Sequence, residues 1–423
     1  MSTHPDSPTT QASVRTSAVN RHHSRLRSAF VFGPVAVPAT ETIADRLVTM
    51  AAAGAHTRIG LRPDPHSASW GFDPQALRRV VCSAPDPGDD PLALLSAVRG
   101  HEADPLRVAT GGNHIAIDFD HGLGDAGLLN AVADVILGVN DPADPATWQR
   151  YTHRTPVLAV AAARVAVDPR RLVGLLGLLR RTPSAHTAAG ATEVGTAITV
   201  SEARERPAAL GYRLSEDCLR EVRDARRAAM PGVGIYALTT VALVNALTEA
   251  GILLEECVTT PFDARGYLPR SRSTLGNFSA GLAFPVPPGS SPAGLQQALS
   301  HSTRIGRPVA NLALVEVKTR LIPARHRPPD TLLPRISLLH SSVGHIPGGE
   351  HRFSWLDNNT AQVLAIADPP QISGLTITSA LVGGGICFGA AYHTKTIAPQ
   401  TLASAMNRVE HHLRELVGLP GSP

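Results

Sequence analysis

A strand that alternates in polarity, a turn rich in glycine and an amphipathic helix follow one another near residue 120, and this succession limits the fold more than any other feature. The strand is Ile115-Ala116-Ile117-Asp118-Phe119-Asp120 and the turn is His121-Gly122-Leu123-Gly124-Asp125. Strand side chains alternate between two faces, whereas helical positions recur about every 3.6 residues, as in the helix predicted over 126–138. The pattern therefore predicts a strand and a helix that pack on each other, with the turn at the edge of a sheet.

His121 and Asp125 are the residues of this turn that can carry chemistry. Polar side chains at the ends of strands are commonly presented to a cleft by a rigid scaffold. A neutral imidazole can take a proton from a hydroxyl or an amine near pH 7, and an alcohol needs such a base before it can attack an acyl thioester. The motif therefore makes His121 a candidate general base, with Asp125 four residues further on.

The same turn also fits a fingerprint for dinucleotide binding. Gly122, Gly124 and Gly127 have the G-x-G-x-x-G spacing, after a strand and before a helix. That fingerprint requires an acidic residue about twenty positions later at the end of a second parallel strand. Asp141 and Asp144 lie near that distance, but they stand in an Asp/Pro-rich loop at 141–148 with no strand before it. Dinucleotide binding therefore stays an alternative that lacks its structural context.

Strands and helices are mixed along the whole chain. Strands are predicted at 29–37, 57–63, 105–121 (two strands about the turn 110–113), 194–200, 255–260, 279–286, 336–346, 361–367, 374–381 and 384–392. Helices are predicted at 41–54, with Thr40 as N-cap, and at 92–98, 126–138, 156–181, 215–229, 235–250, 292–305, 309–320 and 398–416. The stretch 156–181 is predicted to form one long or two short helices, with the break at Asp168-Pro169, because proline interrupts the hydrogen bonding of a helix.

This order predicts an α/β protein with three parts. Residues 1–27 are rich in Ser, Thr, His and Arg and are predicted to form a disordered tail. An N-terminal half over 28–185 carries the His121 motif, and a C-terminal half over 193–423 follows a linker at 182–190.

Composition excludes several classes of function. Aromatic residues make up only 4% and the net charge of +4 is spread along the chain, so no nucleic-acid surface is predicted. The four cysteines and the many histidines lack the spacing of metal ligands, and no metal site is predicted. Scattered cysteines are typical of reduced thiols, which indicates the cytoplasm, and no apolar run is long enough for a membrane span. A monomer is expected.

Three segments, in order, resemble the chloramphenicol-acetyltransferase-like superfamily. Its members include condensation domains of peptide synthetases, polyketide-associated acyltransferases and plant alcohol acyltransferases. The segments are the strand, His121 motif and helix start over 115–126, then Phe262-Asp263-Ala264-Arg265 with Tyr267-Leu268-Pro269, and finally Leu275-Gly276-Asn277-Phe278. The second is similar to the family's Asp-x-Arg region and the third to its Gly-Asn segment. The resemblance covers roughly residues 28–417.

The resemblance implies two similar halves, each a mixed sheet flanked by helices, with a tunnel between them. It implies that His121 is the general base and that Asp125 points away from substrate and pairs with Arg265. Asn277 would lie beside the tunnel, where it either stabilises an oxyanion or ties the loop. The donor would be acyl-coenzyme A or a phosphopantetheinyl carrier protein, with no tightly bound cofactor. The acceptor would be a hydroxyl or an amine of a small metabolite or a lipid, in natural-product or lipid biosynthesis.

Two positions depart from the motif of many condensation domains. Asp120 stands where those domains carry a first histidine, and Ala126 stands where they carry glycine. These departures point away from peptide condensation and leave a second hypothesis open. In that hypothesis the chain is a catalytically inactive condensation-like protein that binds or recruits a carrier protein or a partner enzyme.

Overall fold

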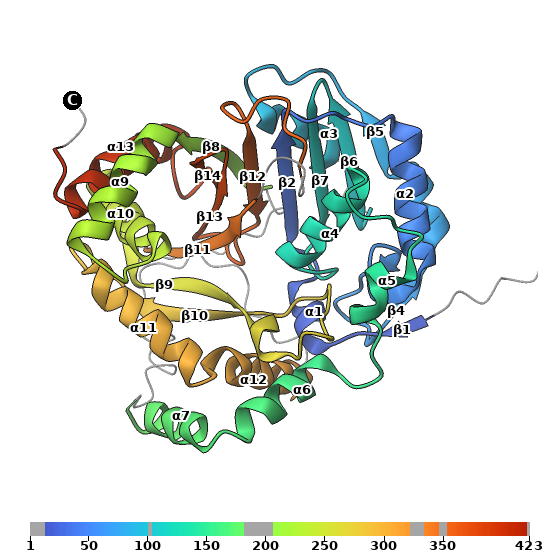
Figure 1. Cartoon of the computed structure of the whole chain (residues 1–423), viewed down its shortest axis with the longest axis horizontal. Coiled ribbons are helices and arrows are strands. Elements are labelled where there is room, and N and C mark those ends of the chain that lie inside the picture. The colour runs from blue at the N-terminus through green and yellow to red at the C-terminus, as the bar shows by residue number, and fades with distance from the viewer. Residues whose placement is uncertain (1–12, 100–103, 182–205, 322–333, 347–352, 421–423) are drawn as a thin grey trace, which may run out of the picture.

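The sheet that carries β7 (His114–Asp120) sets the position of the candidate base. In the computed structural model, which describes residues 13–99, 104–181, 206–321, 334–346 and 353–420, β7 lies in a five-stranded sheet (Figure 1). Its neighbours, in spatial order, are β12 (Gln362–Ala367) and β2 (Arg27–Gly33) on one side, and β6 (Leu106–Gly111) and β5 (Val81–Ser83) on the other. The predicted linker at 182–190 and the predicted strand at 194–200 fall outside the described residues.

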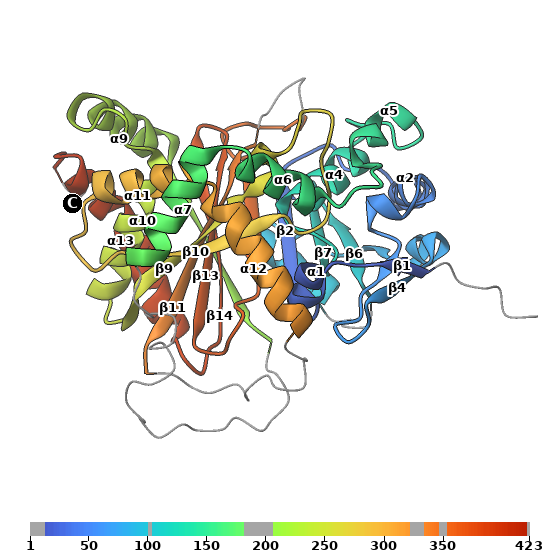
Figure 2. The same cartoon turned by 90° about the horizontal axis from the view of Figure 1, so that it is seen from below.

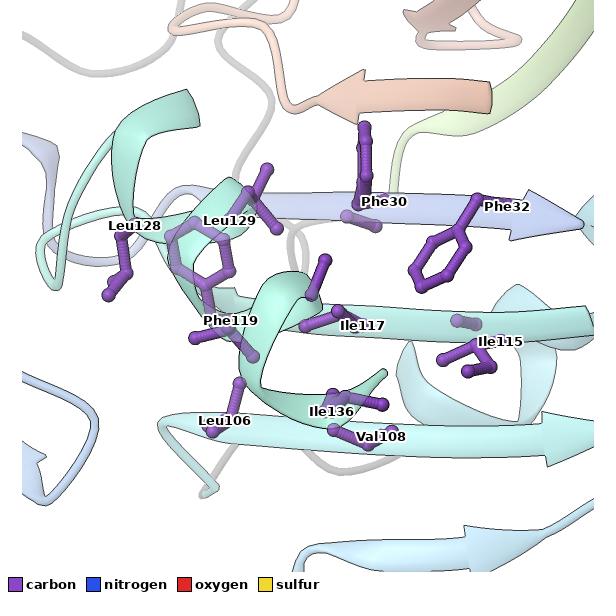
Figure 3. Packing of buried hydrophobic residues seen from close by; sticks show 14 of the residues in the cluster. Phe30, Phe32, Leu106, Val108, Ile115, Ile117, Phe119, Leu128, Leu129 and Ile136 are labelled. Carbon is purple, nitrogen blue, oxygen red and sulfur yellow. The ribbon is translucent and has the colours of Figure 1, made fainter. Parts of the chain in front are cut away.

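Helix α4 (Ala126–Ile136) covers one face of this sheet together with α2 (Thr40–Ala52). Figure 3 shows side chains of β2, β6 and β7, among them Phe30, Ile117 and Phe119, gathered against Leu129 and Ile136 of α4. All of these side chains are buried. The strand–turn–helix unit predicted from the alternating pattern is therefore confirmed.

The opposite face of β7 is buried as well, which the alternation did not predict. Asp118 is 0% exposed and pairs with Arg27 and with Arg99 of α3 (Leu95–Arg99). Burial raises the pKa of Asp118, and the two arginines oppose that rise. An acidic residue on the second face of the strand thus marks a buried ion cluster rather than a solvent-exposed face.

A second, six-stranded mixed sheet forms the core of the other half. Its spatial order is β10 (Ser279–Pro285), β9 (Leu254–Asp263), β11 (Ile336–His345), β13 (Gly374–Val382), β14 (Gly385–Tyr392) and β8 (Ala208–Leu214). The described helices that flank it include α9 (Glu216–Ala229), α10 (Ile235–Glu249), α11 (Pro292–Arg304) and α13 (Pro399–Leu416). The chain therefore has two halves, each a mixed sheet flanked by helices, and the predicted α/β class is confirmed.

The boundary between the halves is not a single point in the sequence. Strand β12 comes from the C-terminal segment but pairs with β2, where Val363 lies opposite Phe32. Residues 13–27, which we predicted to be part of a disordered tail, form β1 (Ser13–Arg15) and α1 (Ala18–His23). Strand β1 pairs with β4 (Ser69–Phe72) in a small sheet that ends with β3 (Leu61–Arg62). The prediction of disorder was therefore wrong for these residues.

Several local predictions also differ from the structure. The N-cap of α2 is Ala39, without a side-chain hydrogen bond, rather than Thr40. The predicted strand at 57–63 contains only β3, because residues 55–57 form the short 3-10 helix η1 (Ala55–Thr57). The loop predicted at 141–148 contains α5 (Pro145–Trp148), which Asp144 caps. Strand β8 was not predicted at all.

Three helices lie together on one side of the molecule. They are α6 (Val157–Ala166), α7 (Pro169–Arg181) and α12 (Arg307–Leu321), and Figure 2 looks onto them. The division between α6 and α7 falls at Asp168-Pro169, as predicted. A search of the described helices finds none with the length and apolar character needed to span a membrane.

Candidate active site

His121 lies just past the end of β7, and the turn after it fixes the tautomer of its ring. Its backbone N–H donates to the carbonyl of Leu26 over 2.7 Å. Its ring Nδ1 lies 2.9 Å from the carbonyl oxygen of Gly124. Because a carbonyl only accepts hydrogen bonds, this geometry places the ring proton on Nδ1 and leaves the lone pair on Nε2. The side chain is half-buried, so the ring stays partly accessible.

The two glycines of the turn are required by close packing rather than by left-handed backbone. A Cβ at Gly124 would lie 2.2 Å from the carbonyl oxygen of Leu275, and one at Gly122 would lie 2.9 Å from that of Asn20. Neither glycine has a positive φ. Gly124 therefore lets the turn lie close to the C-terminal half, and Gly122 lets it lie close to Asn20 near the N-terminus, because neither position carries a side chain.

Asp125 joins the turn to the C-terminal half. As N-cap of α4, its carboxylate accepts from the N–H of Gly127 at 3.0 Å. It forms a two-pronged pair with the guanidinium of Arg265, at 2.8 and 3.0 Å. It also accepts from the N–H of Phe278 at 3.0 Å and from Oγ of Ser279 at 3.1 Å. A single buried carboxylate thus satisfies donors from both halves.

These donors keep Asp125 ionised. Burial would raise the pKa of this carboxyl, but Arg265 and the backbone donors outweigh burial and hold the pKa below its usual range. Among the described residues, no hydrogen bond joins Asp125 to the ring of His121. Asp125 therefore supports the turn and does not orient the imidazole directly.

Arg265 connects the same turn to the Gly-Asn segment. Its Nε donates to the carbonyl of Thr274 at 2.9 Å, and Nη2 donates to that of Gly276 at 3.0 Å. Nη1 also pairs with Asp263 at 3.0 Å. Although burial opposes the charged form, Asp125 and Asp263 raise the pKa of Arg265, so the guanidinium is always charged. The pairing that the resemblance implied for Asp125 and Arg265 is thus present, within a wider network.

Asn277 binds the backbone of the turn through its side-chain amide. Its Nδ2 donates to the backbone carbonyl of His121 at 2.7 Å and to Oδ1 of Asn20 at 3.2 Å. Its backbone N–H donates to the same Oδ1 at 3.0 Å. Both hydrogens of the amide are therefore engaged with protein atoms, which favours the loop-tying role over the oxyanion role that the sequence left open.

Arg58 is part of the site and was not identified from the sequence. Its guanidinium donates to the carbonyl of Leu123 and, at 3.1 Å, to the carbonyl of Gly122. Its backbone has a φ of 72°, a conformation that non-glycine residues rarely adopt. Burial lowers the pKa of Arg58 to about 10, against the opposing charge of Asp125. No local pattern distinguishes this arginine from the chain's others, because its role depends on contacts more than sixty residues away.

Helix α1 forms one wall beside the candidate base. The ring centroid of His23 lies 4.8 Å from that of His121, with the rings tilted by 36°. The carboxylate of Asp120 accepts from the N–H of Gly122 at 2.7 Å and from the N–H of Arg25 at 3.2 Å. Asp120 therefore fastens the end of α1 to the turn, and the segment predicted to be disordered supplies part of the site.

The tunnel that the resemblance implies stays a prediction. A hollow of about 270 Å³ lies between residues 89–92 and strands β8 and β12, and its lining contains none of the predicted site residues. Within the described ranges, no three side chains of His, Cys, Asp or Glu are grouped so as to hold a metal ion.

Comparisons with known proteins identify the fold through solved structures alone. No protein-family model matches the sequence, and a search of curated proteins finds no match. The structure is similar to that of a trichothecene 15-O-acetyltransferase from Fusarium sporotrichioides, with a TM-score of 0.60, 12% identity and 95% of each chain covered. It is similar to the epimerization domain from the third module of tyrocidine synthetase B, with a TM-score of 0.55, 11% identity, and 99% of this chain and 98% of that chain covered.

A third neighbour is a starter condensation domain of rhizomide synthetase in complex with C8-CoA and Leu-SNAC. Its TM-score is 0.56 and its identity 12%, with 97% of this chain and 96% of that chain covered. Each alignment extends over nearly the whole of both chains, so the likeness concerns the complete two-half architecture. The chain therefore has the fold of the chloramphenicol-acetyltransferase-like superfamily.

Proposed function

We propose that this chain is an acyltransferase in which His121 is the general base. The observation that carries the proposal is the ring geometry, in which Nδ1 donates to the carbonyl of Gly124 and Nε2 keeps the lone pair. The solved neighbours include both an acetyltransferase and an epimerization domain, so the fold alone does not select the reaction. The tautomer and the rigid support of the turn are what favour proton abstraction from an acceptor.

In the proposed reaction, Nε2 of His121 takes the proton of an acceptor hydroxyl or amine as the acceptor attacks the thioester carbonyl. The tetrahedral intermediate then expels the thiol, which leaves with that proton, and an ester or an amide remains. Asp125, Arg265 and Asn277 are positioning residues in this scheme. They fix the backbone from which His121 projects and do not touch the substrates.

The proposed donor is an acyl thioester carried by coenzyme A or by a phosphopantetheinyl carrier protein. The complex of the rhizomide starter condensation domain with C8-CoA supports a thioester donor for this fold. The proposed acceptor is a small molecule or a lipid. No tightly bound cofactor takes part in this chemistry, because the thioester itself supplies the activated acyl group.

Release of free thiol tests the proposal. Purified protein with an acyl-coenzyme A series and a pool of hydroxyl and amine acceptors should release thiol, and His121→Ala should lower the rate by about a hundredfold or more. His411→Ala, which removes an exposed histidine of α13, is the matched control and should keep the wild-type rate. An equal rate in the His121→Ala protein would refute the assignment of the base.

The alternative is a catalytically inactive protein that recruits a carrier protein or a partner enzyme. The departures from the motif of many condensation domains, Asp120 in place of the first histidine and Ala126 in place of glycine, are the observation that favours it. If the wild-type protein releases no thiol with any donor but binds an acylated carrier protein, this second proposal is supported instead.

A further inference from the structure

Exposed aliphatic side chains gather on α7, on α12 and at the residue after α6, far more than elsewhere in the described chain. Of ten large hydrophobic side chains that are exposed there, seven belong to these helices or to the residue after α6: Val167, Leu172, Val173, Leu176, Leu314, Val317 and Leu321. Val173 is 69% exposed and Leu321 is 76% exposed. Surface helices of soluble proteins normally turn their polar side outward, so this concentration requires an explanation.

The outward direction of these side chains follows from how α7 packs. A Cβ on Gly174 would lie 2.5 Å from the side chain of Ile305, so this side of α7 lies directly against the body of the protein. Leu175 packs on the same side, against a buried cluster that α1 and α6 share with the C-terminal half. Val173 and Leu176 therefore point away from the protein, because they lie on the opposite side of a helix with 3.6 residues per turn.

The same region is strongly basic. Residues 157–178 and 307–321, which we call the basic aliphatic face, contain six arginines or lysines and two acidic residues. Their net charge is +4, equal to the net charge of the whole chain, so the remainder of the chain has no net charge. Arg164, Arg170, Lys318 and Arg320 are exposed on this face. Both acidic residues are already paired, Asp168 with Arg171 and Glu316 with Arg320.

The three helices lie on one side of the molecule in both views (Figures 1 and 2). Aliphatic side chains on two helices, α7 and α12, with cations beside them form the pattern of elements that lie on a lipid surface. The exposed apolar residues are Leu and Val, which are under-represented among the side chains that dominate binding at protein interfaces, whereas Leu is common on the apolar side of helices that lie on lipid. Charge and side-chain type together favour lipid over an acidic protein partner.

We propose that the basic aliphatic face binds the surface of an anionic lipid bilayer. The Leu and Val side chains would enter the boundary between headgroups and hydrocarbon, while the arginines and lysines would lie at the level of the lipid phosphates. This surface attachment requires no membrane-spanning helix. It is separate from the site at His121 and does not depend on the chemistry proposed there.

Sedimentation with lipid vesicles tests the proposal. The full chain should sediment with vesicles of phosphatidylcholine that contain phosphatidylglycerol, and much less with phosphatidylcholine alone, and added salt should weaken the binding. The double variant Val173→Glu/Leu176→Glu should bind at least about tenfold more weakly, because it loses aliphatic contact and adds two negative charges. Arg170→Ala should weaken binding about fivefold.

Three control proteins separate this effect from misfolding and from catalysis. Leu253→Glu replaces a leucine that is 66% exposed outside the face and should bind as the wild type does. His121→Ala should also bind normally, so vesicle binding and acyl transfer can fail independently. The double variant should keep the wild-type melting temperature, because both replaced side chains are exposed.

Each other occupant of the face gives a distinct result that would overturn the proposal. A wild-type dimer that the double variant converts to a monomer, without vesicle binding, would make the face an interface between two copies. Retention by an acidic carrier protein but not by anionic vesicles would make it a protein-docking surface. Equal vesicle binding by wild type and double variant would show that the face does not contact lipid.

Discussion

Replacing Asp125 with alanine would leave the Arg265 guanidinium buried without its main counter-charge. The two side chains are only 10% and 17% exposed, so solvent screens the pair weakly. Removal of one member of a buried pair costs roughly 3–5 kcal/mol. Arg265 would keep Asp263 and the carbonyls of Thr274 and Gly276, so we expect a loss near the lower end, about 3 kcal/mol.

Asp263→Ala is the matched control, because Asp263 contacts the same guanidinium at 3.0 Å but its side chain is 60% exposed. An exposed partner contributes little, so this variant should lose about 1 kcal/mol or less. Both proteins would be unfolded in urea and followed by circular dichroism. Equal free energies of unfolding for the two variants would refute the argument that burial makes the Asp125–Arg265 pair important.

The double variant Asp125→Ala/Arg265→Ala separates the pair from the rest of the network. It should be less destabilised than the sum of the two single variants, by about 1–3 kcal/mol, because the second change removes the charge that the first leaves uncompensated. Additive losses would show that the two side chains act independently, which the distances of 2.8 and 3.0 Å do not favour.

The pH dependence has a definite sign. The folded pKa of Asp125 is lowered, whereas the unfolded chain keeps a value of about 3.9. The stabilisation from this carboxylate is therefore fully present above the unfolded pKa and is lost as the pH falls towards the folded pKa. The wild-type protein should lose stability more steeply below about pH 4 than Asp125→Asn does, as measured by the urea midpoint at each pH.

Two further predictions concern the contacts of the turn. Gly124→Ala should destabilise the protein by about 1–3 kcal/mol in urea unfolding, because the added Cβ would meet the carbonyl of Leu275. The control is Gly266→Ala, which should change the free energy of unfolding little, because its Cβ would meet nothing within 4 Å. Asn277→Ala should lower kcat for thiol release with little change in KM, because it frees the backbone of His121 without touching substrate; a change in KM alone would contradict this role.

The local pattern around β7 was sufficient to predict the strand, the turn and the helix that follow one another there. Apolar residues of period two change to apolar residues of period 3.6 at the turn, and each period reflects the geometry of its element. Most helices of the C-terminal half were predicted for the same reason, among them the helix at 215–229, which the structure shows as α9.

The elements that were missed have weak local patterns and depend on distant partners. Helix α1 has six residues and ends in Arg21, His22 and His23, which are typical of an exposed tail. Glu316 of α12 accepts from the N–H groups of Ala18 and Val19 at the start of α1, almost three hundred residues along the chain. A carboxylate at the N-terminus of a helix stabilises the helix, but a carboxylate from a distant segment cannot be recognised in the sequence around the helix.

In the candidate site, too, the residues with a local sequence motif were predicted, and a residue that acts only through distant contacts was missed. The motif predicted His121 and Asp125, and the resemblance brought Arg265 and Asn277 to the same place. Arg58 was missed, since its side chain acts on the carbonyls of Gly122 and Leu123 from a segment without a recognisable motif. Contacts between segments far apart in the chain, rather than the motif, thus determine how rigidly the candidate base is held.

Asp120, which replaces the first histidine of many condensation domains, leaves the ring of His121 free of its own carboxylate. Its carboxylate holds the N–H of Gly122 and the end of α1, while the ring of His121 is fixed independently through the carbonyl of Gly124. Burial raises the pKa of Asp120, and backbone donors from Arg25 and Gly122 oppose that rise. Because the carboxylate supports the turn without occupying Nε2 of His121, the substitution leaves the proposed base its lone pair, and the active-enzyme proposal is stronger than the inactive alternative.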